Sequence, residues 1–131
     1  MEARIGQELA LLRQRFPTLE YRDDGRWVRI PEHPLSAGWN RATTDVAFQI
    51  PVAYPGTPPY GIYVPAGLTF KEARPDNYTE PASNPPPFDG TWGIFSWTTQ
   101  DGQWHAGAEP LKGSNLLNWV VGFSERFREG K

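Results

Sequence analysis

The sequence predicts an α+β domain in which an antiparallel sheet is covered on one side by helices. Apolar residues recur at helical spacing near both ends of the chain, and apolar and polar residues alternate in several short runs between those ends. A long stretch rich in proline and asparagine, residues 70–89, has neither period and is expected to be irregular. The 131 residues suffice for one hydrophobic core, so we expect a single domain over residues 1–131.

A first helix is expected near the N-terminus. Ile5, Leu9, Leu12 and Phe16 are spaced by four, three and four residues, which places them on one apolar stripe. Pro17 ends the pattern, because proline has no amide hydrogen and clashes with the preceding helical turn. We therefore expect an amphipathic helix that packs its stripe on the sheet.

Two short alternating runs, residues 19–22 and 26–30, predict the first two strands. Asp24 and Gly25 lie between them, and an Asp-Gly pair is typical of a tight hairpin because glycine tolerates a positive φ. Residues 31–43 contain two prolines and no alternation, so they are expected to form a loop.

Two more runs predict the third and fourth strands of an antiparallel meander. In residues 44–50, the side chains of Val46, Phe48 and Ile50 would share one face, and residues 60–64 supply the next strand. The sequence thus predicts four strands before the irregular stretch.

The connection between these two strands is stiff. Four prolines lie between residues 51 and 59, and proline lacks an amide donor and fixes φ, so continuous sheet is excluded there. We expect a rigid, extended crossover (residues 51–59). Tyr54 is expected to pack its ring on the prolines and to give the crossover a small apolar core of its own.

A second helix is expected near the C-terminus, where apolar residues return at helical spacing. They are Leu116, Leu117, Val120, Val121, Phe123 and Phe127. Ser114 is the expected N-cap, since a serine hydroxyl can accept a hydrogen bond from an amide of the first turn.

Composition excludes several classes of function. The net charge is -2 and neither sign forms a long block, so we expect no nucleic-acid and no membrane partner. The chain has no cysteine, which excludes disulfides, thiolate metal sites and thiol nucleophiles, and we assign no metal and no cofactor. The charged N-terminus and the lack of about 18 consecutive apolar residues predict a cytoplasmic protein.

The order of elements resembles the ubiquitin-conjugating enzyme (UBC) fold and its RWD relatives. The likeness rests on the motif Tyr-Pro-x-x-Pro-Pro at residues 54–59, after the third strand, and on a tryptophan-containing loop that leads into the last helix. A more particular resemblance is to the bacterial UBC-like family E. It is carried by the stretches "PLSAGWNRATTDVAFQIPVAYPGTPP" and "GQWHAGAEPL" and by the spacing of Trp92 and Trp97.

The resemblance implies a place in a bacterial ubiquitin-like conjugation system, with an activating enzyme and a ubiquitin-like protein as partners. Members of the UBC family carry a histidine-proline-asparagine segment and then a cysteine that forms a thioester, and this sequence has neither. "GIFSW" at residues 93–97 stands near the family's cysteine, and Asn77 or Asn84 stands near its asparagine. Without cysteine, thioester chemistry is impossible.

Acyl transfer through a hydroxyl is the remaining enzymatic hypothesis. Ser96 is the candidate acceptor of an oxyester, and His105 is the candidate base, because a serine hydroxyl is hardly ionised at neutral pH. Asn84 is a further candidate for the site. The competing interpretation is an ordinary serine between two aromatic residues and a histidine at the surface.

A binding hypothesis competes with the enzymatic one: a pseudo-enzyme adaptor whose surface contacts its partners. In the UBC family the first helix often presents basic residues to the activating enzyme, although the same residues could form a solvated face with ion pairs to Glu8. Loop aromatics and the crossover would add a contact surface, unless they pack internally. A structural interaction domain unrelated to conjugation is the third interpretation. The candidate partner-binding residues are Arg4, Arg13, Arg15, Tyr54, Pro58, Pro59, Trp92, Trp97 and Trp104, with Trp39 as a further loop aromatic.

Overall fold

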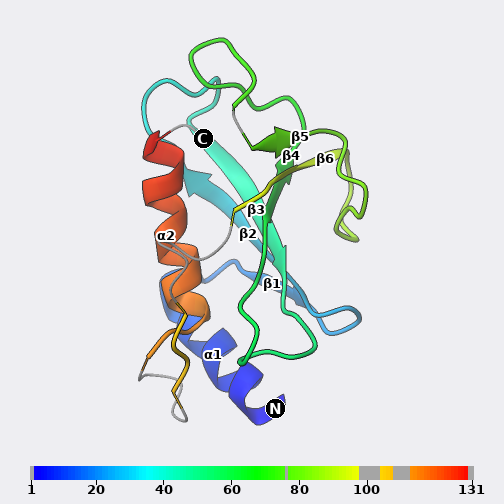
Figure 1. Ribbon diagram of the computed structural model, residues 1–131, viewed down its shortest axis with the longest axis vertical. Helices are drawn as coiled ribbons and strands as arrows, with labels where there is room; N and C mark the ends of the chain where they lie inside the picture. The colour runs from blue at the N-terminus through cyan, green and yellow to red at the C-terminus, as the bar shows by residue number, and fades with distance from the viewer. Residues whose placement is uncertain (1, 76, 98–103, 108–112, 130–131) are drawn as a thin grey trace.

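A computed structural model describes residues 2–75, 77–97, 104–107 and 113–129 of the chain. An antiparallel sheet stands between two helices on one side and an irregular, proline-rich segment on the other (Figure 1). The expected α+β class, with a helix near each end of the chain, is confirmed.

The described residues form two helices and six strands. The helices are α1 (Glu2–Arg15) and α2 (Leu116–Glu129), and the strands are β1 (Glu20–Arg22), β2 (Trp27–Pro34), β3 (Thr43–Gln49), β4 (Ile62–Pro65), β5 (Tyr78–Thr79) and β6 (Trp92–Phe95). The strand order is β1-β2-β3-β4-β6-β5, and every neighbouring pair is antiparallel. The four-stranded meander is therefore present, but β6 and β5 extend it into a larger sheet than we expected.

The first hairpin forms where the Asp-Gly pair predicts it. Gly25 and Arg26 have φ values of 81° and 57°, the left-handed conformations that let β1 turn into β2. The prediction that a loop begins at residue 31 is wrong, because β2 continues to Pro34. Pro31 is tolerated because the register shifts between Ile30 and His33, and a bulge accepts a residue without an amide donor. Pro34 is the last residue of the strand, beyond the residues that pair with β1.

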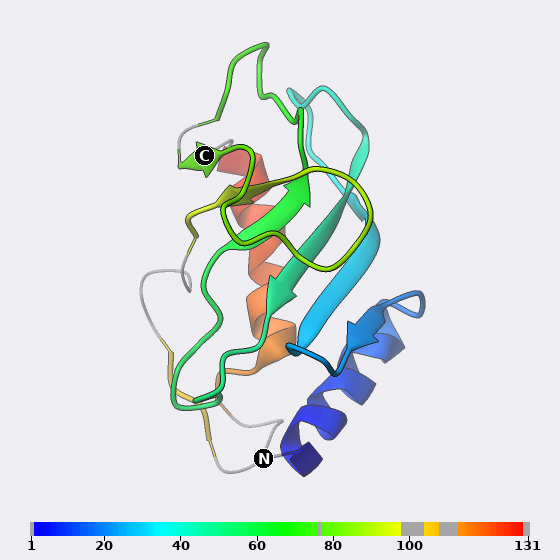
Figure 2. The ribbon, with the colours of Figure 1, turned by 90° about the vertical axis from the view of Figure 1, so that its right-hand side faces the viewer.

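The two faces of the sheet alternate along each strand, as the period of two requires. The inner face carries Val28, Val46, Phe48 and Val64, and it packs against both helices in one core. The outer face carries Trp27, Ala47, Tyr63 and Trp92, which form a second buried cluster together with Ala82 from the segment between β5 and β6. The segment between β5 and β6 crosses this outer face (Figure 2), so the sheet is covered on both sides rather than on one.

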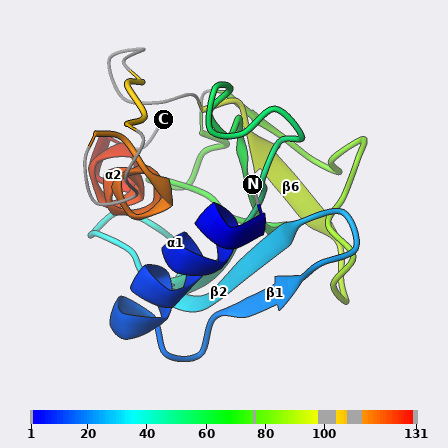
Figure 3. The ribbon, with the colours of Figure 1, turned by 90° about the horizontal axis from the view of Figure 1, so that it is seen from below.

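Helix α1 uses the predicted stripe. Ile5, Leu9 and Leu12 are buried in the main core and Phe16 packs at its margin. Its N-terminal half lies at the same end of the molecule as the first turn of α2 (Figures 1 and 3). Neither described helix has the length and apolar character that a membrane span requires.

Helix α2 begins one residue later than a serine cap would require. Asn115, not Ser114, is the N-cap: its side-chain oxygen accepts a 2.8 Å hydrogen bond from the amide of Asn118, and the Asn118 side chain accepts one of 3.0 Å from the amide of Asn115. This reciprocal pair is a capping box built from two asparagines. Ser114 instead accepts a hydrogen bond from the amide of His105.

Candidate functional site

The crossover is fixed to the rest of the protein by Tyr54. Its side chain is fully buried in the main core, so the small separate core that we expected for the crossover is not what forms. The Tyr54 hydroxyl donates a 2.6 Å hydrogen bond to Oε1 of Glu8 on α1. Burial raises the pKa of the Tyr54 hydroxyl far above its usual value, so the hydroxyl stays protonated and remains the donor.

Glu8 is the acceptor at which three segments meet. The same Oε1 accepts a 2.7 Å hydrogen bond from the backbone amide of Leu116, and Oε2 accepts one of 2.7 Å from Nε of Arg4. The side chain of Glu8 is only 1% exposed. A buried carboxylate is tolerated here because charged and polar donors satisfy it, and its negative charge lies at the positive end of the α2 dipole.

The ion pair that we considered between Glu8 and Arg4 is therefore confirmed, but Glu8 is buried and does not lie on a solvated face. The sequence does hold a signal for its burial: Glu8 follows Ile5 by three residues and precedes Leu12 by four, so it belongs to the apolar stripe. The basic residues of α1 divide accordingly. Arg4 is 12% exposed and also donates to the carbonyl of Gly107, whereas Arg13 and Arg15 are exposed in the last turn.

The other side of the crossover faces solvent. Val52 is 89% exposed, and Tyr60, which follows the crossover directly, is 59% exposed. Of the two candidate prolines, Pro58 is half-buried and Pro59 is buried. These two exposed side chains are the candidate contact surface near the crossover.

Trp104 supports the crossover instead of standing free. Its indole nitrogen donates a 2.8 Å hydrogen bond to the carbonyl of Pro55, and its ring lies 5.9 Å from that of Tyr54. The residue is partly buried. It contributes to the rigidity of the crossover more than to its exposed surface.

The remaining loop aromatics do not form the recognition surface that we considered. Trp92 lies in β6 and is buried on the outer face of the sheet. Trp97 is buried in the main core, where its ring stacks on Phe95 at 4.4 Å. Trp39 is buried as well. Trp92 and Trp97 pack internally because β6, which we did not predict, carries Trp92 and ends two residues before Trp97. Trp39 packs instead against Phe70 and Phe127.

The candidate acyl site is built around Ser96, which follows the last residue of β6 and is exposed. Its amide donates a 2.8 Å hydrogen bond to the carbonyl of Asn77, so the structure brings Asn77 next to Ser96. Asn84 lies in the exposed part of the segment between β5 and β6. The described hydrogen bonds of the exposed His105 lead to Ser114. Within the described residues, these contacts place no base against the Ser96 hydroxyl.

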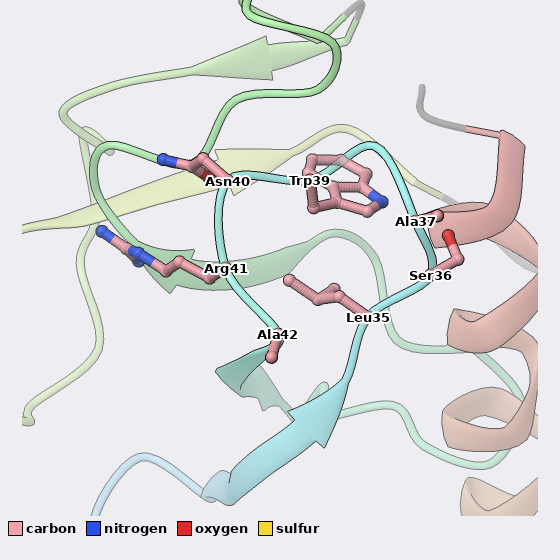
Figure 4. A pocket seen from close by; sticks show the side chains of 7 residues that line it. All are labelled: Leu35, Ser36, Ala37, Trp39, Asn40, Arg41 and Ala42. Atoms are coloured by element: carbon pink, nitrogen blue, oxygen red, sulfur yellow. The ribbon is translucent and has the colours of Figure 1, made fainter.

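A shallow depression of about 380 Å³ lies over the loop between β2 and β3 (Figure 4). It is lined by Leu35, Ser36, Ala37, Trp39, Asn40, Arg41 and Ala42. Its polar groups already bind the protein itself: the indole nitrogen of Trp39 donates to the carbonyl of Phe127 at 2.8 Å, and Asn40 and Arg41 donate to backbone carbonyls of residues 65–67. The hydrogen bonds of these lining residues therefore hold the loop between β2 and β3 and connect it to the end of α2.

Among the described residues, the histidine, aspartate and glutamate side chains do not gather in a group of three that could hold a metal ion. Comparison with protein-family models, with curated proteins and with solved structures gave no match. The likeness to the UBC fold thus rests on the sequence motifs alone.

Proposed function

We propose that the protein is a non-catalytic adaptor of a bacterial ubiquitin-like conjugation system, which binds the activating enzyme or the ubiquitin-like protein. One observation carries the proposal: the crossover is anchored through Tyr54 to Glu8, and Val52 within it and Tyr60 directly after it are exposed. The UBC-like motifs of the sequence supply the class of partner. The absence of cysteine from the chain removes the thioester route.

The anchoring favours binding for a physical reason. A loop that is already ordered loses little conformational entropy when a partner docks on it, so more of the contact free energy becomes affinity. Val52 and Tyr60 would lose water-exposed apolar surface on association, which favours binding. Arg13 and Arg15, exposed on α1, would add electrostatic steering toward an acidic partner.

An oxyester carrier is the second candidate function. The observation that favours it is the exposure of Ser96 directly after β6, with Asn77 beside it. An acyl transfer to Ser96 would form a bond from its oxygen to the carboxyl carbon of the modifier, and the activating enzyme would release its thiolate. The hydroxyl proton would need a base, which the described contacts of Ser96 do not provide.

One experiment separates the two candidates. The protein is mixed with the activating enzyme and the ubiquitin-like protein of the same genome and with ATP, then measured by native mass spectrometry and, after denaturation, by intact mass. The adaptor predicts a native complex and no covalent adduct. A mass gain equal to the modifier minus water, which disappears with Ser96→Ala and with hydroxylamine, would establish the carrier instead.

Matched variants locate the surface. Val52→Asp with Tyr60→Ser should weaken the native complex at least tenfold, whereas Val121→Asp should leave it unchanged, although Val121 on α2 is also 43% exposed. Charge reversal of Arg13 and Arg15 should lower the association rate. If the wild-type protein binds neither partner, the adaptor function is refuted. If the crossover and α2 variants weaken the complex equally, the contact surface does not lie at the crossover.

A further inference from the structure

The outer face of the sheet carries three large aromatic side chains that would be exposed without a covering segment. Trp27 on β2, Tyr63 on β4 and Trp92 on β6 form this aromatic face, and the rings of Trp27 and Tyr63 meet edge to face at 5.2 Å. Ala47 lies among them on β3, where its short side chain leaves room. All of these residues are buried, although they project away from both helices.

The covering segment is the strap (residues 83–90), with the sequence "SNPPPFDG". Figure 2 shows the connection between β5 and β6 as a broad loop across the strands. Within the strap, Pro86 is buried and Phe88 half-buried, and the six other residues are exposed. Phe88 packs on the aromatic face, and Pro86, two positions before it, is the buried proline of the strap.

Polar contacts also hold the strap. The indole nitrogen of Trp92 donates to the carbonyls of Phe88 and Asp89, both at 3.2 Å. The guanidinium of Arg29 lies 5.7 Å from the centre of the Phe88 ring, in cation–π geometry. The aromatic face therefore binds the strap through a tilted ring contact between Phe88 and Trp92 at 6.2 Å and through the indole N–H donor, and Arg29 lies beside the face.

The ends of the strap are pinned independently of these contacts. The amide of Ala82 donates to the carbonyl of Trp92 at 2.8 Å, and the amide of Ala66 donates to the carbonyl of Thr91 at 2.9 Å. A loop whose two ends are close and fixed can lift from a surface without unpairing the strands beside it. Six of the eight residues of the strap are exposed, which is typical of the less stable parts of a fold.

We propose that the aromatic face is a recognition surface for proline-rich peptides with an aromatic residue, and that the strap occupies it as an intramolecular ligand. Proline-rich segments bind other proteins in this manner: aromatic side chains receive the prolines and an indole N–H donates to a peptide carbonyl. The strap has the same chemistry and shows which ligand the face accepts. This inference does not depend on the role in conjugation.

The attachment of the strap sets the affinity for an external peptide. A tethered ligand competes at an effective concentration of the order of millimolar, so the wild-type protein binds an external peptide weakly. A change that weakens the binding of the strap without altering the aromatic face raises the affinity for the external peptide. The affinity rises by the factor by which the strap is weakened. The competition makes the proposal testable with the chain's own sequence.

The test uses the synthetic peptide Ser-Asn-Pro-Pro-Pro-Phe-Asp-Gly and the double variant Pro86→Ser with Phe88→Ala, which keeps the strap at its natural length. Binding is followed by tryptophan fluorescence and by the NMR signal of the Trp92 indole. The variant should bind the peptide at least tenfold more tightly than the wild type, and a peptide with alanine in place of phenylalanine should not compete. No saturable binding to a folded variant would overturn the proposal.

A second measurement needs no variant and applies if the double variant fails to fold. Hydrogen exchange of the wild-type protein is recorded for the Trp92 indole and for the amide of Phe123, which lies in the buried part of α2. If the strap opens on its own, the indole should exchange at least tenfold faster than global unfolding allows. Equal protection at both sites would show that the strap lifts only when the whole protein unfolds, and would overturn the proposal.

Discussion

The hydroxyl of Tyr54 lies 2.6 Å from a carboxylate oxygen of Glu8, and this hydrogen bond fastens the crossover to α1. Both residues are buried. Tyr54→Phe should therefore lower the free energy of unfolding by about 2 kcal/mol, because a buried carboxylate loses one of its donors. Urea denaturation checks the value. Tyr60→Phe is the control at an exposed tyrosine and should change the stability by less than about 0.5 kcal/mol. Equal losses in both variants would contradict the anchoring role.

Gly93 on β6 is required by the aromatic ring of Tyr78 on β5. A β carbon at position 93 would overlap the Tyr78 hydroxyl and ring. Gly93→Ala should cost about 1–3 kcal/mol of unfolding free energy, since the ring and the strand must move apart. Gly6→Ala is the matched control: the added methyl meets nothing within 4 Å, and alanine is the better helix former, so stability should rise slightly. Thermal denaturation of the two variants tests the contrast.

His33 should make the stability depend on pH. Its ring is buried next to α2, 6.2 Å from the ring of Phe123 and 5.5 Å from the ring of Phe127. This burial lowers the pKa of the His33 imidazole below the usual 6.5. The unfolded chain therefore binds the proton more readily than the folded one. His33 contributes stability above pH 6.5 that is lost as the pH falls toward the lowered pKa, with a slope of at most about 1.4 kcal/mol per pH unit.

The pH dependence is measured as the free energy of unfolding between pH 7.5 and 5. His33→Leu replaces the titrating group by an apolar side chain. The free energy of unfolding of the variant should therefore rise relative to that of the wild type as the pH falls. A constant difference across this range would show that His33 does not titrate with folding.

The cap of α2 gives a further prediction. Asn115→Ala should destabilise the protein by about 1 kcal/mol, because the amide of Asn118 loses its acceptor. Asn115→Ser should restore most of the loss, since a serine oxygen can accept the same hydrogen bond. If Asn115→Ser is as unstable as Asn115→Ala, the Asn115 side chain acts through some contact other than the cap.

Much of the fold follows from periodicity. The stripe through Ile5, Leu9 and Leu12 and the alternation around Phe48 each predicted an element that the structure contains. The prediction of an extended crossover is wrong, because residues 52–56 form turns, and the amide of Thr57 donates to the carbonyl of Ala53 at 3.1 Å. Strand β6 was not predicted because Trp92 and Phe95 lie on opposite faces of the sheet that are both covered. The strand therefore shows no alternation of apolar and polar residues. Strand β5 has two residues, too few for any period.

The candidate site was harder to predict than the fold. Glu8 has a charged side chain at a core position, and only its distant partners Tyr54 and Leu116 explain its burial. Trp92 on the outer face was expected near a loop because the strand that holds it was not expected. The neighbours of Ser96 depend on a turn near Asn77, and no sequence pattern specifies that geometry.

Both ends of α2 are tied to remote parts of the chain. The Leu116 amide binds Glu8 across 108 positions, and the Phe127 carbonyl accepts from the Trp39 indole across 88. Contacts between residues so far apart in the sequence give a high contact order. The chain loses the conformational entropy of closing long loops before these contacts form. The docking of α2 should therefore be a late and slow step of folding. Until it occurs, the inner face of the sheet is exposed and prone to aggregation.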